Sequence, residues 1–289
     1  TGLGSEVVVS STTMKDGIVT KTDKPGIDII IKPGTKNESV HIPVVLSQTG
    51  LDDLVYNDFY VGEGSDVLIV AGCGIHNGGD KKSSHDGIHT FHIGKNARVR
   101  YVEKHYGEGD GNGLRIMNPT TVVDIDENGY MEMETTQIKG IDSTDRITKG
   151  RLGDGAAFIV KEKIMTHGKQ YAKTSFEVEL NGKGSSTNVI SRSVAKNDST
   201  QVFYAKIDGN ITAAELSRLV GPLDENLRQI ENAFGVQVLR RGHNFRFAGV
   251  QAAGAAQVLR RAAARIHGGL TQKKHTCHLF SPGRKYPEK

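Results

Sequence analysis

Short runs in which apolar and polar residues alternate fill most of the first 210 residues. The runs end at Gly, Asn, Pro or Asp, the residues that terminate strands and form turns. They predict strands at Ile27–Ile31, Val40–Leu46, Val67–Ala71, His89–Ile93, Val99–Glu103, Thr120–Ile125, Met131–Ile138, Phe158–Met165, Thr174–Leu180, Asn188–Val194 and Thr200–Ile207. No helical period of apolar residues precedes Asn210, and this part of the chain is therefore predicted to be all β.

One corner motif recurs between these strands. An apolar residue, a Gly- or Asn-rich turn and a second apolar residue form five copies, which begin at Val61, Ile93, Ile125, Leu152 and Leu180. The copies are 32, 32, 27 and 28 residues apart. A near-constant period predicts a stacked β-solenoid, in which each coil buries its apolar row against its neighbours. Gly and Asn suit the corners because these turns need a positive φ. Two polar segments, 72–86 and 106–118, are predicted to be long loops.

The pattern changes to a helical period after Asn210. The predicted elements are a helix over 213–220, a helix over 223–234, strands at Val236–Arg240 and Phe245–Ala248, and an Ala-rich helix over 251–267. The last residues are basic and show no periodicity, which predicts disorder. The expected organisation is therefore a β-helix over 1–210, a small α+β module over 211–268 and a disordered basic tail over 269–289.

Composition supports two modules. Hydrophobic residues make up 36% of the 289, with 35 Gly and no Trp, which suits a solenoid with a thin core. Residues 211–289 carry 13 Lys and Arg against 5 Asp and Glu, whereas the remainder carries 24 against 28. The net charges of +8 and −4 predict different partners for the two parts. The two cysteines, Cys73 and Cys277, argue against a disulfide framework and suit a reducing cytoplasm. No apolar stretch is long enough for a membrane span and no signal peptide is recognised.

Several long segments carry a resemblance to a known family. They are Val70–Asn77, His85–His92, Tyr101–Gly109, Arg115–Thr120, Gln137–Thr144, Lys161–His167 and Ile190–Lys196. In this order they resemble the core of the SufB/SufD scaffold proteins of the SUF system, over about residues 15–210. The resemblance implies a right-handed parallel β-helix that pairs with a sister subunit and docks an ABC-type ATPase. It also implies that a transient iron–sulfur cluster is assembled on this platform and passed to apo-proteins.

The resemblance ends near Asn210. In the family, a further β-helical and helical region follows, with the Cys, His and Glu residues thought to hold the cluster. That region has no counterpart in this sequence, so the core is expected to be truncated and the scaffold incomplete.

The second module resembles a different family. Segments Leu216–Glu231 and Gly235–Phe245 are similar to the N-terminal KH-like domain of PhoH-like proteins, which are associated with RNA metabolism. The P-loop ATPase that accompanies this domain in that family is missing, because no G-x-x-x-x-G-K-[ST] motif occurs in the chain.

A cluster of imidazole and thiol side chains marks the first module. Cys73, His76, His85, His89, His92 and His105 fall within 33 residues. Candidate sulfur- or iron-handling residues are Cys73, Glu103, Lys104 and His105, and candidate metal ligands are His76, His89 and His105. The alternative is that the histidines are surface or corner residues bonded to backbone, and that Glu103, Lys104 and His105 lie on a solvent-facing strand. Cys73 alone cannot build a four-cysteine cluster site.

Basic residues mark the second module. Arg240, Arg241, His243 and Arg246 are candidate RNA contacts, because guanidinium groups pair with phosphates and stack on bases. The alternative is a solvated basic face, since no G-x-x-G loop stands where a KH domain needs it.

Three hypotheses follow. The first is a non-enzymatic, cytoplasmic scaffold for iron–sulfur cluster assembly that acts through protein contacts and tends to self-associate. The second is an RNA-binding module carried on an inert β-helix. The third is a structural chimera with neither activity. No phosphate loop or nucleophile triad favours an enzyme.

Overall fold

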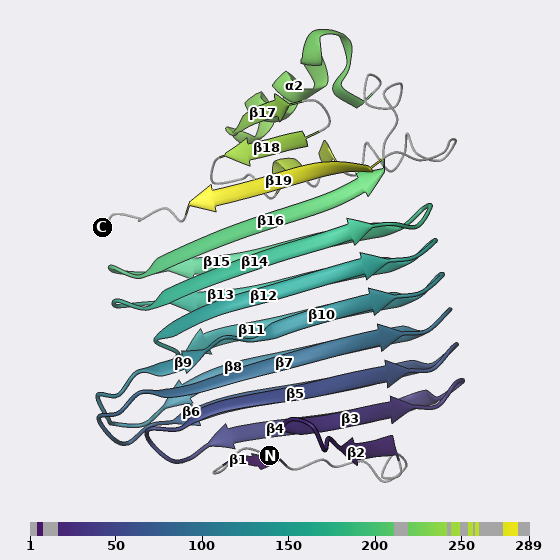
Figure 1. The fold of residues 1–289 in the computed structure, drawn as a ribbon. Helices are drawn as coiled ribbons and strands as arrows, with labels where there is room; N and C mark the ends of the chain where they lie inside the picture. Colours follow the sequence, from purple (N-terminus) through teal and green to yellow (C-terminus); the bar gives the residue numbers. More distant parts are fainter. Residues whose placement is uncertain are drawn as a thin grey trace.

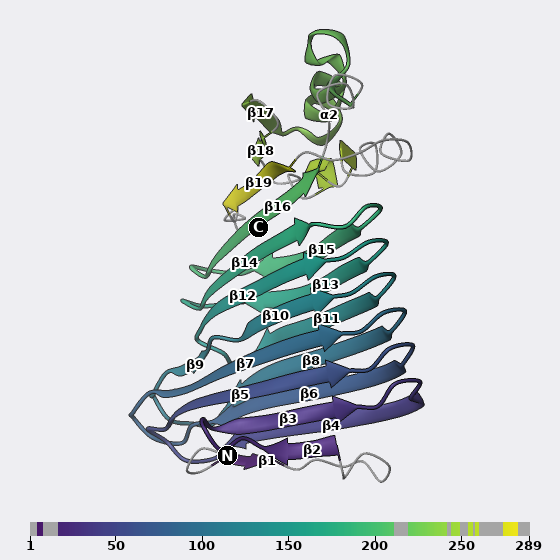
Figure 2. The same cartoon turned by 45° about the vertical axis from the view of Figure 1, so that its right-hand side comes forward.

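Residues 17–210 wind into a parallel β-solenoid in which each coil gives one strand to each of two facing sheets (Figures 1 and 2). The computed structural model describes residues 5–7, 17–210, 219–241, 244–248, 254–256, 258–259 and 274–282. From β3 to β16 all strand pairs between successive coils are parallel. The predicted β-solenoid is confirmed.

The first sheet has seven strands in the order β1-β4-β6-β8-β11-β13-β15. Their bounds are β1 Ser5–Val7, β4 Lys36–Leu46, β6 Asp66–His76, β8 Arg98–Glu108, β11 Tyr130–Lys139, β13 Ala157–Thr166 and β15 Ser186–Ala195.

The second sheet has twelve strands, eleven of them in the order β17-β18-β19-β16-β14-β12-β10-β7-β5-β3-β2. Their bounds are β2 Ile18–Thr20, β3 Gly26–Ile31, β5 Asp52–Val61, β7 Ser83–Ile93, β10 Thr120–Ile125, β12 Ser143–Leu152, β14 Tyr171–Leu180, β16 Thr200–Asn210, β17 Gln237–Arg241, β18 Asn244–Ala248 and β19 Lys274–Pro282. The twelfth, β9 (Arg115–Met117), pairs with β7 and β12.

The corners adopt the backbone conformation that their sequence predicts. Positive φ angles occur at one residue of each corner copy, namely Gly64, Asn96, Asn128, Gly155 and Gly184. The backbone N–H of each of the first four donates to a carbonyl of the next corner along the solenoid. The corners therefore stack one on another in the same way as the strands do.

Stacking in register also builds the apolar core. Phe59 on β5 lies opposite Phe91 on β7, and their rings are parallel with centroids 4.3 Å apart. Both rings are fully buried, and Phe158 and Phe176 fill the later coils. Burying a large aromatic side chain stabilises a fold by about 1.5–3 kcal/mol, so these rows supply much of the cohesion between coils.

The two predicted loops are shorter than expected. Strand β6 continues to His76 and β7 begins at Ser83, so only residues 77–82 connect them. Likewise β8 continues to Glu108 and β9 begins at Arg115. The Gly-rich sequence disfavours strands locally, but neighbouring coils offer paired strands on both sides and override that preference. As a result Cys73 and His85 lie on strands, not in a loop.

The C-terminal part extends the second sheet. Helix α2 (Glu225–Phe234) follows a 3-10 turn at Pro222–Asp224, and Gly235 ends it with φ 58°, as predicted. Strands β17 and β18 form a hairpin near the predicted positions. The predicted helix over 213–220 lies mostly outside the described residues, and the described parts of 251–267 are helical. The KH-like resemblance stays a prediction.

The described part of the tail, Lys274–Pro282, is a strand, although the tail was predicted to be disordered. Strand β19 pairs antiparallel with β16 and parallel with β18, and so joins the hairpin to the solenoid. The edge strand of a terminal coil has unpaired backbone N–H and C=O groups, which can form hydrogen bonds with another extended segment. Strand β19 therefore covers the edge of β16, while β1 and β2 cover β4 and β3 at the other end.

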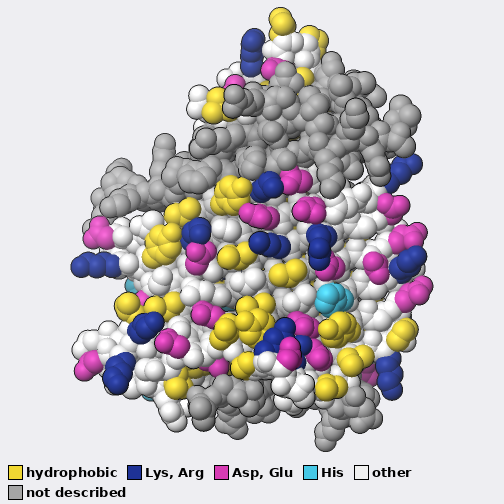
Figure 3. Space-filling view, in the orientation of Figure 1, with side chains coloured by type: hydrophobic (Ala, Val, Ile, Leu, Met, Phe, Trp, Pro, Cys, Tyr) yellow, Lys and Arg dark blue, Asp and Glu magenta, His cyan; other side chains and the backbone are white. Residues whose placement is uncertain are grey.

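The outer face of the solenoid carries both charged and apolar side chains. Charged side chains of both signs alternate with apolar ones over the face seen in Figure 3. Some pair across coils, such as Arg151 with Asp124 at 2.6 Å and Lys173 with Asp145 at 2.9 Å. Exposed pairs of this kind contribute only about 0–1 kcal/mol each, so the interior decides stability. No helix in the described parts of the chain is long and apolar enough to cross a membrane.

Removal of residues 211–289 is expected to cause self-association. The shortened chain loses β19 and leaves the edge of β16 unpaired, which favours pairing between copies. Light scattering during size-exclusion chromatography, over a range of protein concentrations, measures this. A shortened chain that stays monomeric while the full chain is also monomeric would contradict the capping role of β19.

Candidate thiol site inside the solenoid

The interior of the solenoid is divided into an apolar and a polar part. Alternate residues of each strand point inward, and in several coils these residues are polar. The buried polar set includes Asp53, Asn57, His85, His89, Glu103, His105, Thr121, Thr135, Gln137, Arg146, Thr148, Glu162 and Thr174. Buried polar groups need partners, and here most of the partners are other members of this set.

Strand register places Cys73 beside two histidines. On the first sheet, Cys73 of β6 is directly opposite His105 of β8. On the facing sheet, His85 of β7 is directly opposite Asp53 of β5. His85 and His105 both lie close enough to the Cys73 thiol to shift its pKa through charge and hydrogen bonding. The Cys73 residue is only 3% exposed, so this thiol lies wholly within the polar part of the interior.

The Asp53 carboxylate orients His85. Its Oδ2 lies 2.8 Å from Nδ1 of His85, and both side chains are buried. With Nδ1–H donated to a carboxylate, Nε2 is left to face the thiol, as in the Cys–His–carboxylate arrangements that activate thiols.

This arrangement favours a thiolate–imidazolium pair. Burial raises the pKa of Cys73, but the charge of His85 and the hydrogen bonds from both histidines outweigh it and lower that pKa. Burial lowers the pKa of His85, but the charge of Cys73 and the bond to Asp53 outweigh it and raise that pKa. A thiolate is the nucleophilic form of cysteine, so the site is prepared for attack on an electrophilic sulfur or for binding a soft metal.

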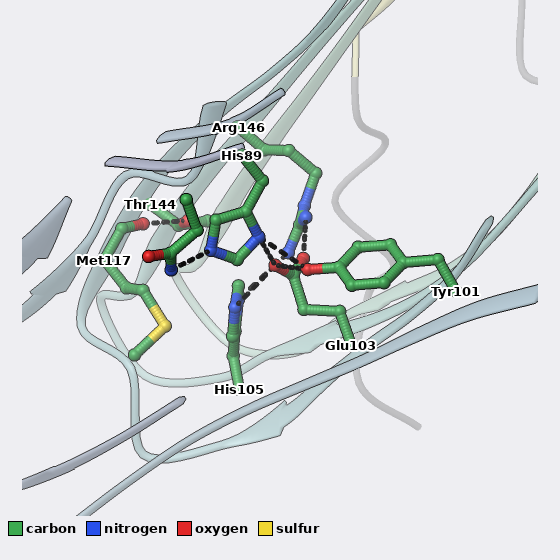
Figure 4. Close-up of polar contacts among 8 residues, drawn as sticks. His89, Tyr101, Glu103, His105, Met117, Thr144 and Arg146 are labelled. Atoms are coloured by element: carbon green, nitrogen blue, oxygen red, sulfur yellow. Dashed lines mark hydrogen bonds and ion pairs between the residues drawn. The ribbon is translucent and has the colours of Figure 1, made fainter. Parts of the chain in front are cut away.

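Glu103 and Arg146 form the centre of a second buried cluster (Figure 4). Arg146 donates from Nη1 to Oε2 of Glu103 at 2.5 Å and from Nη2 to Nδ1 of His105 at 3.0 Å. The hydroxyl of Tyr101 donates to the other carboxylate oxygen of Glu103 at 2.9 Å. Burial raises the pKa of Glu103, but the charge of Arg146 and the hydrogen bond from His105 outweigh it and hold that pKa well below its usual range.

His89 completes the cluster as a neutral group. Its Nδ1 lies 2.7 Å from the Tyr101 hydroxyl, and its Nε2 lies 3.4 Å from Nδ2 of Asn57. Because the Tyr101 hydroxyl donates to Glu103, it accepts from His89 Nδ1–H, and His89 Nε2 accepts from Asn57. Burial and the nearby charges of His85 and Arg146 lower the pKa of His89 to about 4, although Glu103 opposes them.

The structure brings together only some of the candidate residues. Cys73, Glu103 and His105 share the interior, but Lys104 lies on the opposite face of β8 and is exposed, so it takes no part in a relay with them. His76 stands at the end of β6, half exposed, 3.6 Å from Glu108. It is therefore apart from His89 and His105, and the described residues contain no group of three or more potential ligands arranged for a metal ion.

Sequence reasoning missed four residues of the site, namely Asp53, Asn57, Tyr101 and Arg146. Asp53 stands 32 residues before His85, as Cys73 stands 32 before His105 and Asn57 stands 32 before His89. That interval is the repeat period, so residues one coil apart were detectable as partners. Arg146 carries no such signal, because it faces Glu103 across the interior from the other sheet.

The nucleic-acid candidates stay untested. Arg240 and Arg241 lie on β17 and Arg246 on β18, in a hairpin whose register pairs Leu239 with Arg246. His243 lies outside the described residues. RNA binding remains a prediction.

Comparison with known proteins identifies relatives of the solenoid. A family model described as SUF system FeS cluster assembly, SufBD core domain, matches residues 56–216, more than half of the chain. An iron–sulfur cluster assembly SufBD family protein of Methanocaldococcus jannaschii is 28% identical over 184 residues. The match covers 63% of this chain and 57% of that protein, so the chain spans little more than half of its relative's length. No solved structure matches.

The Glu103–Arg146 pair is expected to behave as a coupled unit. Arg146→Met leaves Glu103 charged, buried and unpaired, which costs about 3–5 kcal/mol of unfolding free energy. Adding Glu103→Gln removes the unpaired charge, and the double variant is expected to lose about 2 kcal/mol less than the single one. Urea unfolding of Arg146→Met, Glu103→Gln and the double variant measures the coupling. Losses that simply add would show that the two charges are not coupled.

Stability is expected to fall in acid partly through His89. The pKa of His89 is 6.5 in the unfolded chain and about 4 in the folded protein. The unfolded state therefore binds more protons between these values, and stability that is complete above pH 6.5 is lost as the pH falls toward 4.

Denaturant unfolding as a function of pH tests this expectation. His89→Gln should give a shallower loss between pH 6.5 and 4 than the parent, while the half-exposed control His76→Gln should match the parent. Parallel curves for parent and His89→Gln would exclude this contribution.

Proposed function

Because the chain belongs to the SufBD core family of the SUF system, we propose that it is a non-enzymatic platform for iron–sulfur cluster assembly whose sulfur is received by Cys73. The observation that carries the proposal is the buried thiol between two imidazoles, one of them fixed by Asp53. The solenoid supplies a rigid frame, since strands on both sheets hold these side chains in register.

The chemistry proposed for Cys73 is acceptance of a sulfane sulfur. The Cys73 thiolate attacks the outer sulfur of a donor persulfide, a new S–S bond forms to Cys73, and the bond between the two donor sulfurs breaks. The donor leaves as a thiolate, so no electron is gained or lost overall. A thiolate paired with His85 is suited to this attack because only the thiolate is nucleophilic.

A resident cluster at Cys73 is disfavoured. Iron–sulfur clusters are held by several thiolates, and the described residues offer a single interior cysteine. In this proposal sulfur, iron and the finished cluster are cargo, and the ligands that complete the cluster come from outside the solenoid interior.

Partner contacts are proposed at the end of the first sheet. Strand β15 ends the seven-stranded sheet, and within the described ranges no strand pairs with its outer edge. An open edge of this kind can add a strand from another chain. The resemblance points to a sister scaffold subunit and to an ABC-type ATPase as the partners in the SUF system.

Anaerobic sulfur loading tests the proposal. The protein is incubated with a low-molecular-weight persulfide, and bound sulfane sulfur is measured by cyanolysis and by the mass of one added sulfur atom. We expect one sulfur per chain, lost in Cys73→Ser and kept in the matched control Cys277→Ser. A Cys73→Ser variant that folds and still carries the sulfur would overturn this role.

A separate reconstitution with iron and sulfide tests whether the protein supports cluster assembly. Visible absorption and metal analysis of the parent and of Cys73→Ser follow cluster formation. Cluster absorption that depends on Cys73 supports the platform, and equal absorption in both proteins argues against sulfur entry through this residue.

A further inference from the structure

Arg146 makes a contact that fixes the protonation of its neighbour. A guanidinium group carries only donors and keeps its charge in proteins. Nη2 of Arg146 lies 3.0 Å from Nδ1 of His105, so this nitrogen must present a lone pair to it. A neutral imidazole with a free lone pair on Nδ1 carries its proton on Nε2.

The tautomer decides what His105 offers to the thiol. With Nδ1 occupied by Arg146, His105 can donate to the neighbouring Cys73 thiol only through Nε2–H, and the same Nε2 lies 3.5 Å from Oε1 of Glu103. His105 is then a donor to Sγ and has no free lone pair for the thiol proton. His85 differs, because its Nδ1 faces the Asp53 carboxylate and its Nε2 can accept a proton while Nδ1–H is kept.

We propose that Arg146 is a positioning residue that holds His105 as its neutral Nε2–H tautomer, so that Cys73 exchanges its proton with His85 alone. In this step the proton moves from Sγ to Nε2 of His85, giving a thiolate and an imidazolium that Asp53 stabilises. The inference rests on the sulfur-accepting role proposed above and adds the assignment of its acid–base partner.

The groups around His105 compete for its second proton. Burial lowers the pKa of His105, but the charge of Glu103 and the hydrogen bonds with Cys73 and Glu103 outweigh it and raise that pKa. These groups favour the imidazolium. The 3.0 Å contact with Arg146 opposes it, because a protonated Nδ1 and the guanidinium would both be donors, and the proposal follows this contact. The facing titratable or charged groups are Asp53 on β5, Cys73 on β6, His85 and His89 on β7, Tyr101 and Glu103 on β8, Arg146 on β12 and Glu162 on β13.

The other polar groups that the structure describes near His105 do not hydrogen-bond to its Nδ1. Glu162 is occupied by Thr174 and Ser191, whose hydroxyls donate to its two oxygens. Gln137 lies opposite His105 on the next coil, and its Oε1 has no partner among the described residues. Among the described residues, Arg146 is therefore the hydrogen-bond partner of His105 Nδ1.

Nitrogen NMR of histidine side chains, in Cys277→Ser protein without any sulfur donor, tests the assignment. The parent is expected to show His105 unprotonated at Nδ1 and protonated at Nε2 at neutral pH. Glu103→Gln, which keeps Arg146, should show the same pattern. Glu103→Gln with Arg146→Met differs from it only at Arg146, and should show His105 with a substantial Nδ1–H population.

Several outcomes overturn the inference. An imidazolium or an Nδ1–H tautomer of His105 in the parent does so without any variant, which covers the case of variants that fail to fold. An identical pattern in Glu103→Gln and in the double variant does so as well.

The thiolate gives a second readout. The ultraviolet absorbance of Cys73 against pH is expected to show about tenfold less thiolate at neutral pH in Asp53→Asn, because His85 loses its carboxylate. An unchanged titration in Asp53→Asn would remove His85 as the partner. Neither readout uses persulfide, so a failure of sulfur loading with both results as expected would overturn the proposed function and not this assignment.

Discussion

The repeat of one coil upon the next is the constraint on which the structure depends. In a solenoid each inward side chain meets the residue at the same position one coil before and one coil after. Phe59 thus meets Phe91, and Cys73 meets His105. Polar residues follow one another within a row, as Cys73, His105 and Gln137 do, because a polar group with only apolar neighbours would be buried without a partner. The same row is apolar at its two ends, at Val44 and Ile164. The polar part of the interior exists because several successive coils carry polar residues in matching positions.

Such an interior is costly to maintain. Moving charged groups from water costs several kcal/mol each, and a buried ion pair recovers this only with good geometry and complete hydrogen bonding. Glu103 meets that demand, with Arg146 and Tyr101 on its two oxygens. A chain selected for stability alone would do as well with an apolar core, like that around Phe158 and Phe176. The retention of charge beside a thiol is what one expects where acidity has to be controlled.

The fold was largely predictable from the sequence, but the site only in part. The corners at Gly64 and Asn128 need a positive φ, and Gly and Asn are the residues that adopt it most readily, so the corners are visible in the sequence. Cys73 and His105 were both recognised as reactive residue types, but their proximity depends on the pairing of β6 with β8. Because residues 72–86 were predicted to be a loop, Cys73 was not placed on a strand and this pairing was not predicted. Arg146 could not be found in this way, because contacts across the interior depend on how far apart the two sheets lie and how each is twisted.

Solenoids are commonly lengthened or shortened by whole coils, and the polar interior limits where this chain can tolerate such a change. The contacts of the polar interior extend from Asp53 on β5 to Thr174 on β14. A coil inserted between β8 and β12 would move Arg146 away from Glu103 by one strand spacing, about 4.8 Å, which is farther than any hydrogen bond reaches. A coil added next to β3 or β16 would leave every one of these contacts in place. Variation in length among relatives of this chain should therefore be found at the two ends of the solenoid, and the coils from β5 to β14 should be inherited as a block.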